Sequence, residues 1–112
     1  MNEKLVVLWT SGDREVAINM VFMYTLNAKR KGWFSEVTLI VWGSSAKLLS
    51  QDEELQILVK EMQVEGVKTE ACLRCAENYG VVGDLENLGI EVKLMGQPLT
   101  GYLKEDRKVL TF

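Results

Sequence analysis

The chain has 112 residues with a formal net charge of −3, and it contains two cysteines and no histidine. We expect a chain of this length to form one domain, residues 1–112, that buries roughly two-thirds of its surface without disulfide bonds. The lack of histidine excludes a Ser-His-Asp or Cys-His catalytic site, a histidine general base and a zinc site with imidazole ligands.

Charge and cysteine content also predict the setting in which the protein works. An acidic chain without a basic run has no electrostatic reason to bind nucleic acid or a membrane surface. The first residues lack the pattern of a signal peptide, and the longest apolar run, residues 37–42, is too short to cross a membrane. Two cysteines in such a chain favour a reducing compartment. We therefore expect a soluble cytoplasmic protein that needs no metal and no cofactor.

The first elements follow from short apolar runs and the polar residues after them. Residues 5–9 are a β-branched and aromatic run typical of a buried strand, which ends at the polar loop of residues 10–13. Asp13 can cap a helix that continues to about residue 31, where basic residues and a glycine predict its end. Residues 36–42 predict a second strand, which ends at a glycine-serine loop.

The rest of the chain continues this alternation of strands and helices. Apolar residues at helical spacing predict an amphipathic helix over residues 52–65, with the acidic residues 52–54 at its amino end. The remaining predicted elements are a strand over 67–72, a helix over 75–88 broken around Gly80 and Gly83, a strand over 90–94, a short helix from Gln97 with Pro98 at its first position, and a strand over 108–112.

The order of these elements predicts the fold class. Strands that alternate with helices form right-handed βαβ units and a parallel sheet covered by helices. The predicted fold is therefore α/β, a three-layer α/β/α sandwich with a five-stranded parallel sheet. No linker, repeat or low-complexity stretch interrupts the pattern.

The first predicted helix is apolar nearly all the way round from residue 16 to residue 26. A helix that covers one face of a small sheet needs only one apolar stripe, so its other side needs a second partner. That partner is either a neighbouring helix of the same chain or another subunit. We favour a subunit contact.

The chemistry-bearing residues gather at one edge of the predicted sheet. In a parallel sheet, ligands bind beyond the carboxyl ends of the strands. The predicted loops at this edge supply the candidate site residues Thr10, Ser11 and Gly12, then Gly43 and Ser44, then Cys72, Arg74 and Cys75, and finally Gly96 and Gln97. Both cysteines of the chain lie at this edge, which makes it the predicted site.

Cys72 and Cys75 form a CxxC motif that follows a strand and opens a helix. A thiol at a helix start is favoured as a thiolate, and Arg74 adds a positive charge. A closed zinc site needs four ligands, which one chain without histidine cannot supply. A thioredoxin-like redox pair, a pair of buried structural cysteines and a single nucleophilic cysteine that carries sulfur as a persulfide all remain open. We favour the persulfide, since it needs a thiolate and N–H donors but no imidazole.

A different class of function depends on the first two loops. Residues 10–13 and 43–45 offer hydroxyl and backbone donors for an anion, as in a small-ligand or nucleotide-binding subunit without catalysis. They match neither a P-loop nor a GxGxxG motif. A plain strand-to-helix turn capped by Asp13 is therefore favoured over a phosphate site.

The segment from Ala71 to Val81, the strand residues 89–92 and the ending from Lys108 to Phe112 resemble the DsrE/DsrF-like family, which includes YchN-type and TusD-like sulfur-relay proteins. The opening strand with its threonine-serine and glycine fits as well. The resemblance implies an α/β/α sandwich that assembles into homotrimers or homohexamers.

In the sulfur-relay members, a cysteine at the end of the third strand accepts sulfane sulfur as a persulfide and passes it to a partner. The resemblance assigns this role to Cys72, and it implies a sulfur donor or acceptor protein as a partner. Cys75, one helical turn further on, either resolves the persulfide or packs. The CxxC pair resembles a subgroup of single-gene DsrE-like proteins, so the particular relay partners of other members are not carried over.

Overall fold

The computed structural model describes residues 3–112, which form a five-stranded sheet with all neighbouring strands parallel. The strand order across the sheet is β4-β3-β2-β1-β5. The strands are β1 (Lys4–Trp9), β2 (Glu36–Val41), β3 (Lys68–Cys72), β4 (Glu91–Lys93) and β5 (Lys108–Thr111). The predicted fold class is confirmed.

Helices connect each strand to the next. They are α1 (Arg14–Val16), η1 (Ala17–Phe22), α2 (Met23–Arg30), α3 (Ser44–Gln51), α4 (Glu53–Val64), α5 (Leu73–Tyr79), α6 (Val82–Asn87) and α7 (Gly96–Lys104). The first three form one continuous helix whose middle segment, η1, is π-helical. None of the helices within residues 3–112 is both long enough and apolar enough to cross a membrane.

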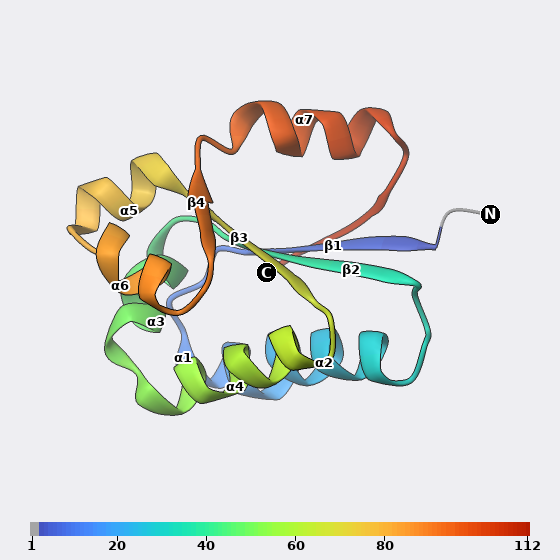
Figure 1. Ribbon diagram of the computed structural model, residues 1–112, viewed down its shortest axis with the longest axis horizontal. Helices are drawn as coiled ribbons and strands as arrows, with labels where there is room; N and C mark the ends of the chain where they lie inside the picture. The colour runs from blue at the N-terminus through green and yellow to red at the C-terminus, as the bar shows by residue number, and fades with distance from the viewer. Residues whose placement is uncertain (1–2) are drawn as a thin grey trace.

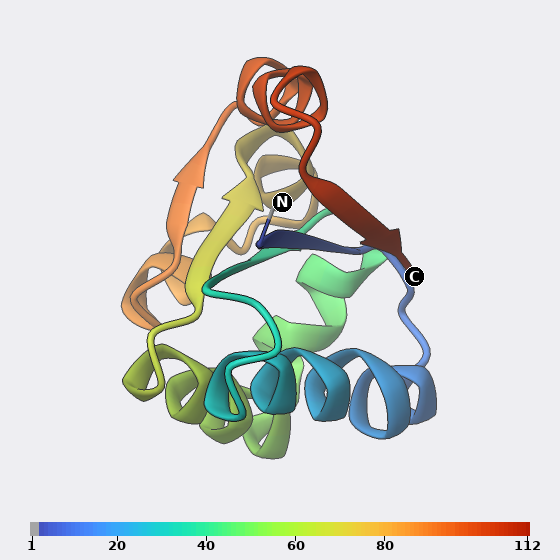
Figure 2. The ribbon, with the colours of Figure 1, turned by 90° about the vertical axis from the view of Figure 1, so that its right-hand side faces the viewer.

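The strand order determines which helices cover which face. From β1 to β4 each strand is added on the same side of the previous one, and right-handed crossovers then put their helices on one face. The chain returns from β4 across the sheet to β5, so the same handedness puts α7 on the opposite face. Figures 1 and 2 show α7 on one side of the sheet and α2 and α4 on the other. The helices α3, α5 and α6 gather beyond the carboxyl ends of the strands (Figure 1).

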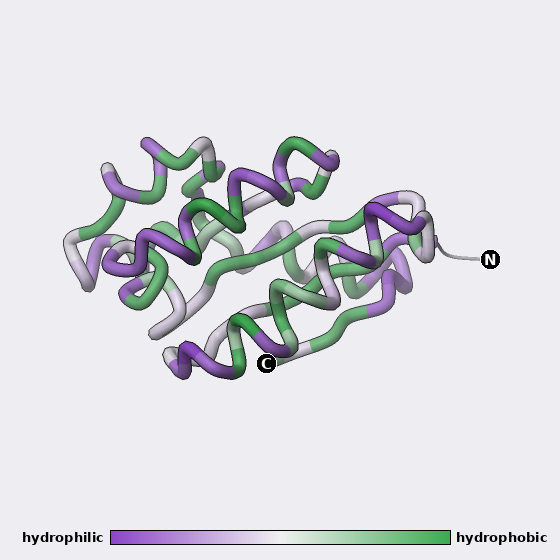
Figure 3. Tube along the Cα trace, turned by 90° about the horizontal axis from the view of Figure 1, so that it is seen from below, coloured by the Kyte–Doolittle hydropathy of each residue, from purple (hydrophilic) through white to green (hydrophobic). Residues whose placement is uncertain are grey.

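Two cores of unequal size result. The larger one joins the sheet to α2, α4 and the helices at the carboxyl edge. The smaller one lies beneath α7, and its buried members are Val6, Ile40, Cys72, Met95 and Tyr102. Green and purple residues alternate along the helices in Figure 3, as expected for helices with one buried side.

Several predicted boundaries are correct and others are wrong. Asp13 caps the first helix by accepting hydrogen bonds from the backbone N–H groups of Glu15 and Val16, and Asp52 caps α4 through the N–H of Leu55. The helix broken near Gly80 is two helices, because Gly80 adopts a left-handed conformation that ends α5. Gly83, in contrast, lies inside α6 and breaks nothing.

The helix α3 was missed, since residues 43–45 were predicted as a loop. Its eight residues lie between a glycine and the cap of α4, too short a stretch for a clear periodic signal. Gly96, predicted as a loop residue, is the first residue of α7, and Pro98 is its third residue rather than its first. The strands β2, β4 and β5 each end one residue earlier than predicted, at Val41, Lys93 and Thr111.

Candidate functional site

The candidate site lies where β3 and β4 end. The connection that leaves β3 lies beyond the end of the sheet and contributes Ala76, Val81 and Leu85 to the larger core, which also holds α4, whereas the connection that leaves β4 runs to the face of α7. A point where neighbouring strands send their connections to opposite faces is the usual ligand position in an open parallel sheet. Cys72 is the last residue of β3, and it lies in register with Lys93, the last residue of β4.

The two cysteines are free thiols within one helical turn of each other. Cys72 has extended backbone angles (φ −71°, ψ 115°) and precedes α5, so its side chain turns toward the first residues of that helix. The backbone N–H of Cys75 donates a hydrogen bond to the Cys72 sulfur at 3.5 Å. Cys72 is 6% exposed and packs in the small core beneath α7, while Cys75 is half-buried.

The surroundings of Cys75 favour its protonated form. Burial raises the pKa of the Cys75 thiol, and a hydrogen bond with Cys72 and the charge of that residue raise it further. The backbone N–H of Gly43, in the loop between β2 and α3, lowers the pKa of Cys75. Gly43 has φ 73° and ψ −143°, a conformation that is open to glycine and strained for other residues. The loops after β2 and β3 therefore meet at Cys75.

The loop after β1 uses most of its polar groups inside the chain. The backbone N–H groups of Thr10 and Ser11 donate to the carbonyl oxygen of Phe112 at 2.6 and 3.1 Å, and the Thr10 hydroxyl donates to the same oxygen at 2.8 Å. The carboxylate of Asp13 occupies the N–H groups at the start of the following helix. An external anion would have to displace these internal partners.

The loops after β1 and β2 are also bonded to each other. The Ser44 hydroxyl donates to the Thr10 carbonyl at 2.9 Å, and the Ser45 hydroxyl donates to the Trp9 carbonyl at 2.6 Å. Gly12 also lies close to Ser44, because a Cβ atom at Gly12 would be 3.2 Å from Ser44 Oγ. The structure thus brings together the predicted residues of the first two loops and, through Gly43, Cys75.

The remaining predicted residues lie apart from this group or point to solvent. Gly96 and Gln97 line a hollow of about 460 Å³ on α7 together with Thr100, Gly101 and Lys104. No other predicted site residue lines it. Arg74 is exposed and has no hydrogen-bond or ion-pair partner among residues 3–112.

A buried carboxylate that sequence reasoning missed lies next to the thiol site. Glu70 is fully buried on β3, two residues before Cys72 and therefore on the same face of the sheet, about 6.6 Å away along the strand. The Tyr102 hydroxyl of α7 donates to Glu70 Oε1 at 2.6 Å. The ammonium groups of Lys93 and Lys68 lie 2.7 and 3.5 Å from Glu70 Oε2. A glutamate inside an otherwise buried strand was the signal that could have revealed this cluster.

The protonation states of the cluster follow from these contacts. Burial on its own would raise the pKa of Glu70, but the hydrogen bonds from Lys93 and Tyr102 and the charge of Lys68 outweigh it and lower that pKa. Burial and the neighbouring carboxylate raise the pKa of Tyr102 to about 12. Glu70 is therefore charged and Tyr102 neutral at physiological pH. Arg107 lies over the Tyr102 ring, 4.3 Å from its centroid.

Comparison with known proteins shows which family the chain belongs to. No family model and no curated protein matches the chain. The solved structure of BT1422 from Bacteroides thetaiotaomicron, described as a conserved protein of unknown function, is 44% identical; the match covers 98% of this chain and 95% of that chain, with a TM-score of 0.95. The chain belongs to the BT1422 family. The predicted resemblance to DsrE-like proteins is confirmed by two further structures that share the fold.

Both of these structures are distant in sequence from this BT1422-family chain. MTH1491 from Methanobacterium thermoautotrophicum, described as a protein of unknown function, is 17% identical over 97% of this chain and 98% of that one, with a TM-score of 0.75. YchN from E. coli is 15% identical over the whole of both chains, with a TM-score of 0.72. The BT1422 family thus has the DsrE-like fold.

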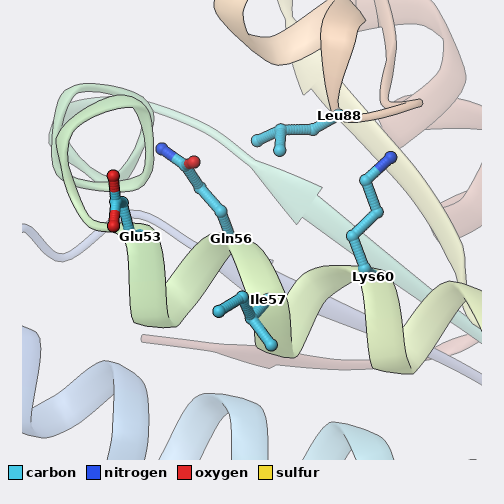
Figure 4. A pocket seen from close by; sticks show the side chains of 5 residues that line it. All are labelled: Glu53, Gln56, Ile57, Lys60 and Leu88. Carbon is cyan, nitrogen blue, oxygen red and sulfur yellow. The ribbon is translucent and has the colours of Figure 1, made fainter.

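Two further hollows of this BT1422-family protein lie away from the cysteines. One is about 330 Å³ and lies between α4 and the residue that follows α6 (Figure 4); it is lined by Glu53, Gln56, Ile57, Lys60 and Leu88. The other is about 320 Å³ and lies on the outer side of the first helix; it is lined by Asn19, Met20, Met23, Tyr24, Asn27 and Trp33. Neither contains a predicted site residue.

The first helix was predicted to be apolar on nearly all sides, and the structure shows what covers one of them. The helix α4 packs against η1 and α2, so a neighbouring helix of the same chain covers one side. On the other side Met20, Met23 and Trp33 remain 39%, 53% and 51% exposed.

Proposed function

We propose that the protein binds and relays sulfane sulfur as a persulfide on Cys72, in the cytoplasm. The observation that supports this most directly is the pair of free thiols at the end of β3, beside the point where the connections of β3 and β4 diverge. Persulfide chemistry needs a thiolate and no imidazole, and the chain has no histidine. A reducing compartment keeps both thiols free.

The loading step is a thiol exchange that needs no external oxidant. The thiolate of Cys72 attacks the outer sulfur of a persulfide or polysulfide donor, a new S–S bond forms, and the donor leaves as a thiolate or a shorter polysulfide. In the relay step, the thiolate of an acceptor attacks the outer sulfur on Cys72 and restores the Cys72 thiolate. A sulfur donor or acceptor protein is the partner that this function requires.

The contacts around Cys72 give each neighbour a role in this chemistry. The N–H of Cys75, 3.5 Å from the Cys72 sulfur, stabilises negative charge on that sulfur. The Cys75 thiol, which its surroundings keep protonated, adds a second donor.

Loading with inorganic polysulfide tests the proposal. After desalting, intact mass spectrometry should find the wild type or Cys75→Ser heavier by one sulfur atom. Wild-type protein that has already lost the added sulfur should be matched by an equal amount of released hydrosulfide. Cys72→Ser should remain unmodified. If no protein form gains sulfur or releases hydrosulfide, or if Cys72→Ser gains as much as Cys75→Ser, the proposal is wrong. A reversible disulfide in the wild type, with no sulfur adduct on Cys75→Ser and no hydrosulfide release, would indicate the dithiol oxidoreductase instead.

We also propose that the protein forms a homotrimer or homohexamer through the outer side of the first helix. Met20, Met23 and Trp33 form an exposed apolar group there, of the kind that marks subunit contacts. Light scattering of the wild type should give a mass of three or six chains. Met23→Lys should lower that mass, whereas Ile57→Lys, a matched change at an exposed position of α4, should leave it unchanged. A monomeric wild type at micromolar concentration would contradict the proposal.

A further inference from the structure

The two thiols are positioned to react with each other. In α-helical geometry the Cα atoms of residues three apart are about 5 Å from each other, which is within the Cα–Cα range that a disulfide can span. The 3.5 Å contact between Cys75 N and the Cys72 sulfur puts that sulfur over the turn that carries Cys75. A side-chain hydrogen bond also links the two residues.

We propose that Cys75 discharges a persulfide formed on Cys72, closing a Cys72–Cys75 disulfide and releasing hydrosulfide. The chain then reduces sulfane sulfur in addition to carrying it. This inference rests on the proposed function, because it requires the persulfide on Cys72.

The step balances without any other group. The Cys75 sulfur attacks the inner sulfur of the Cys72 persulfide, the bond between inner and outer sulfur breaks, and the proton of the Cys75 thiol leaves with the outer sulfur as hydrosulfide. The outer sulfur is reduced by two electrons, and the two cysteine sulfurs are oxidised to the disulfide. Two equivalents of a small thiol then reduce this disulfide and become oxidised to an external disulfide.

Contact between the two cysteines favours the internal reaction over transfer to another molecule. The backbone N of Cys75 already lies 3.5 Å from the Cys72 sulfur, whereas an external thiol must first reach that sulfur. A reaction partner held in place reacts faster than the same group free in solution. The raised pKa of Cys75 is consistent with a thiol that still holds the proton needed by the leaving hydrosulfide.

A single-turnover experiment on the full chain tests this inference. Reduced wild type, Cys75→Ser and Cys75→Ala are charged with inorganic polysulfide, desalted without reductant, and followed by intact mass and by a colorimetric assay of hydrosulfide. The wild type should release about one hydrosulfide per chain and finish lighter by two hydrogens than the reduced protein. The adduct on both Cys75 variants should survive at least roughly tenfold longer. Circular dichroism checks that the variants are folded, and two different substitutions guard against a defect specific to one of them.

The outcomes separate the two proposals. Sulfur adducts of equal lifetime on all three proteins would overturn the inference and leave the proposed function standing, as would equal hydrosulfide release from all three. A failure of every protein to gain sulfur or release hydrosulfide would overturn both. Slow loss from the Cys75 variants together with disulfide formation in the wild type supports the inference.

Discussion

Replacing Tyr102 by phenylalanine removes a single oxygen atom from the smaller core. The lost hydroxyl donates to Glu70 Oε1 at 2.6 Å, and the carboxylate is fully buried, so water cannot readily replace the donor. The ring remains beneath Arg107 and keeps its packing. The experiment therefore isolates one hydrogen bond to a buried charge.

The expected loss is about 2 kcal/mol in the free energy of unfolding, since a hydrogen bond to a charged group contributes about 1.5–3 kcal/mol. With an unfolding entropy of about 2.1 cal/mol/K per residue, a chain of 112 residues should lose about 8–9 °C in Tm. Urea and thermal unfolding followed by circular dichroism measure both quantities. Tyr79→Phe is the matched control, because it removes the hydroxyl of a tyrosine on α5 that is 42% exposed, and it should change stability by less than about 0.5 kcal/mol.

The same variant has a second readout at the thiol. Cys72 and Tyr102 share the core beneath α7, so weaker docking of α7 exposes Cys72 more often. In a Cys75→Ser background, the alkylation rate of Cys72 should rise about tenfold or more with Tyr102→Phe, because each 1.4 kcal/mol changes an opening equilibrium by about tenfold. A stability and an alkylation rate equal to those of Tyr79→Phe would refute the assigned role of the bond.

Three further predictions concern the same region. The pKa of Glu70 is lowered in the folded chain, so its charge contributes stability that is present above the ordinary carboxyl pKa and lost as the pH falls through the folded value. Glu70→Gln should therefore cost about 3 kcal/mol in urea unfolding at neutral pH, and less at about pH 3. The pKa of Tyr102 is raised to about 12 from 10.0, so its contribution should be lost as the pH rises between these values, and alkaline unfolding of Tyr102→Phe should lack that loss. Gly43→Ala should lower the free energy of unfolding in urea by about 1–3 kcal/mol, because the φ angle of Gly43 is 73°. The control Gly101→Ala lies in α7 with open space around it, and it should leave the free energy of unfolding unchanged or raise it by up to about 1 kcal/mol. Equal changes in both variants would contradict the backbone strain assigned to position 43.

The elements with strong hydrophobic patterns could be predicted from the sequence. The buried run of β1, the cap at Asp13, the acidic start of α4 and the spacing of its apolar residues each depend on neighbours within a few positions. The helix α3 and the π-helical segment could not be predicted in the same way. The first is too short for a clear period, and no residue pattern within the second distinguishes π-helical from α-helical backbone.

Only part of the site could be predicted, because local sequence patterns do not reveal the order of the strands in the sheet. The strands β1 and β2 appear as apolar runs and β3 and β4 as short mixed segments, and nothing in these patterns states which strands are neighbours. With the order β4-β3-β2-β1-β5, the connection after β4 leaves on the face of α7. Gly96 and Gln97 consequently lie on a separate hollow, whereas Gly43 reaches Cys75.

The position of Glu70 links the chemistry of the thiol to the docking of α7. Buried ion pairs seldom stabilise a fold more than well-packed apolar residues do, so stability alone does not account for a charged cluster in this core. A hydrogen bond from Tyr102 to one carboxylate oxygen has a single geometry, whereas the apolar contacts of Met95 and Leu99 tolerate sliding. The bond therefore sets the position of α7 on the sheet. Because Cys72 follows Glu70 on the same face of β3, the position of α7 also sets how far that thiol is exposed.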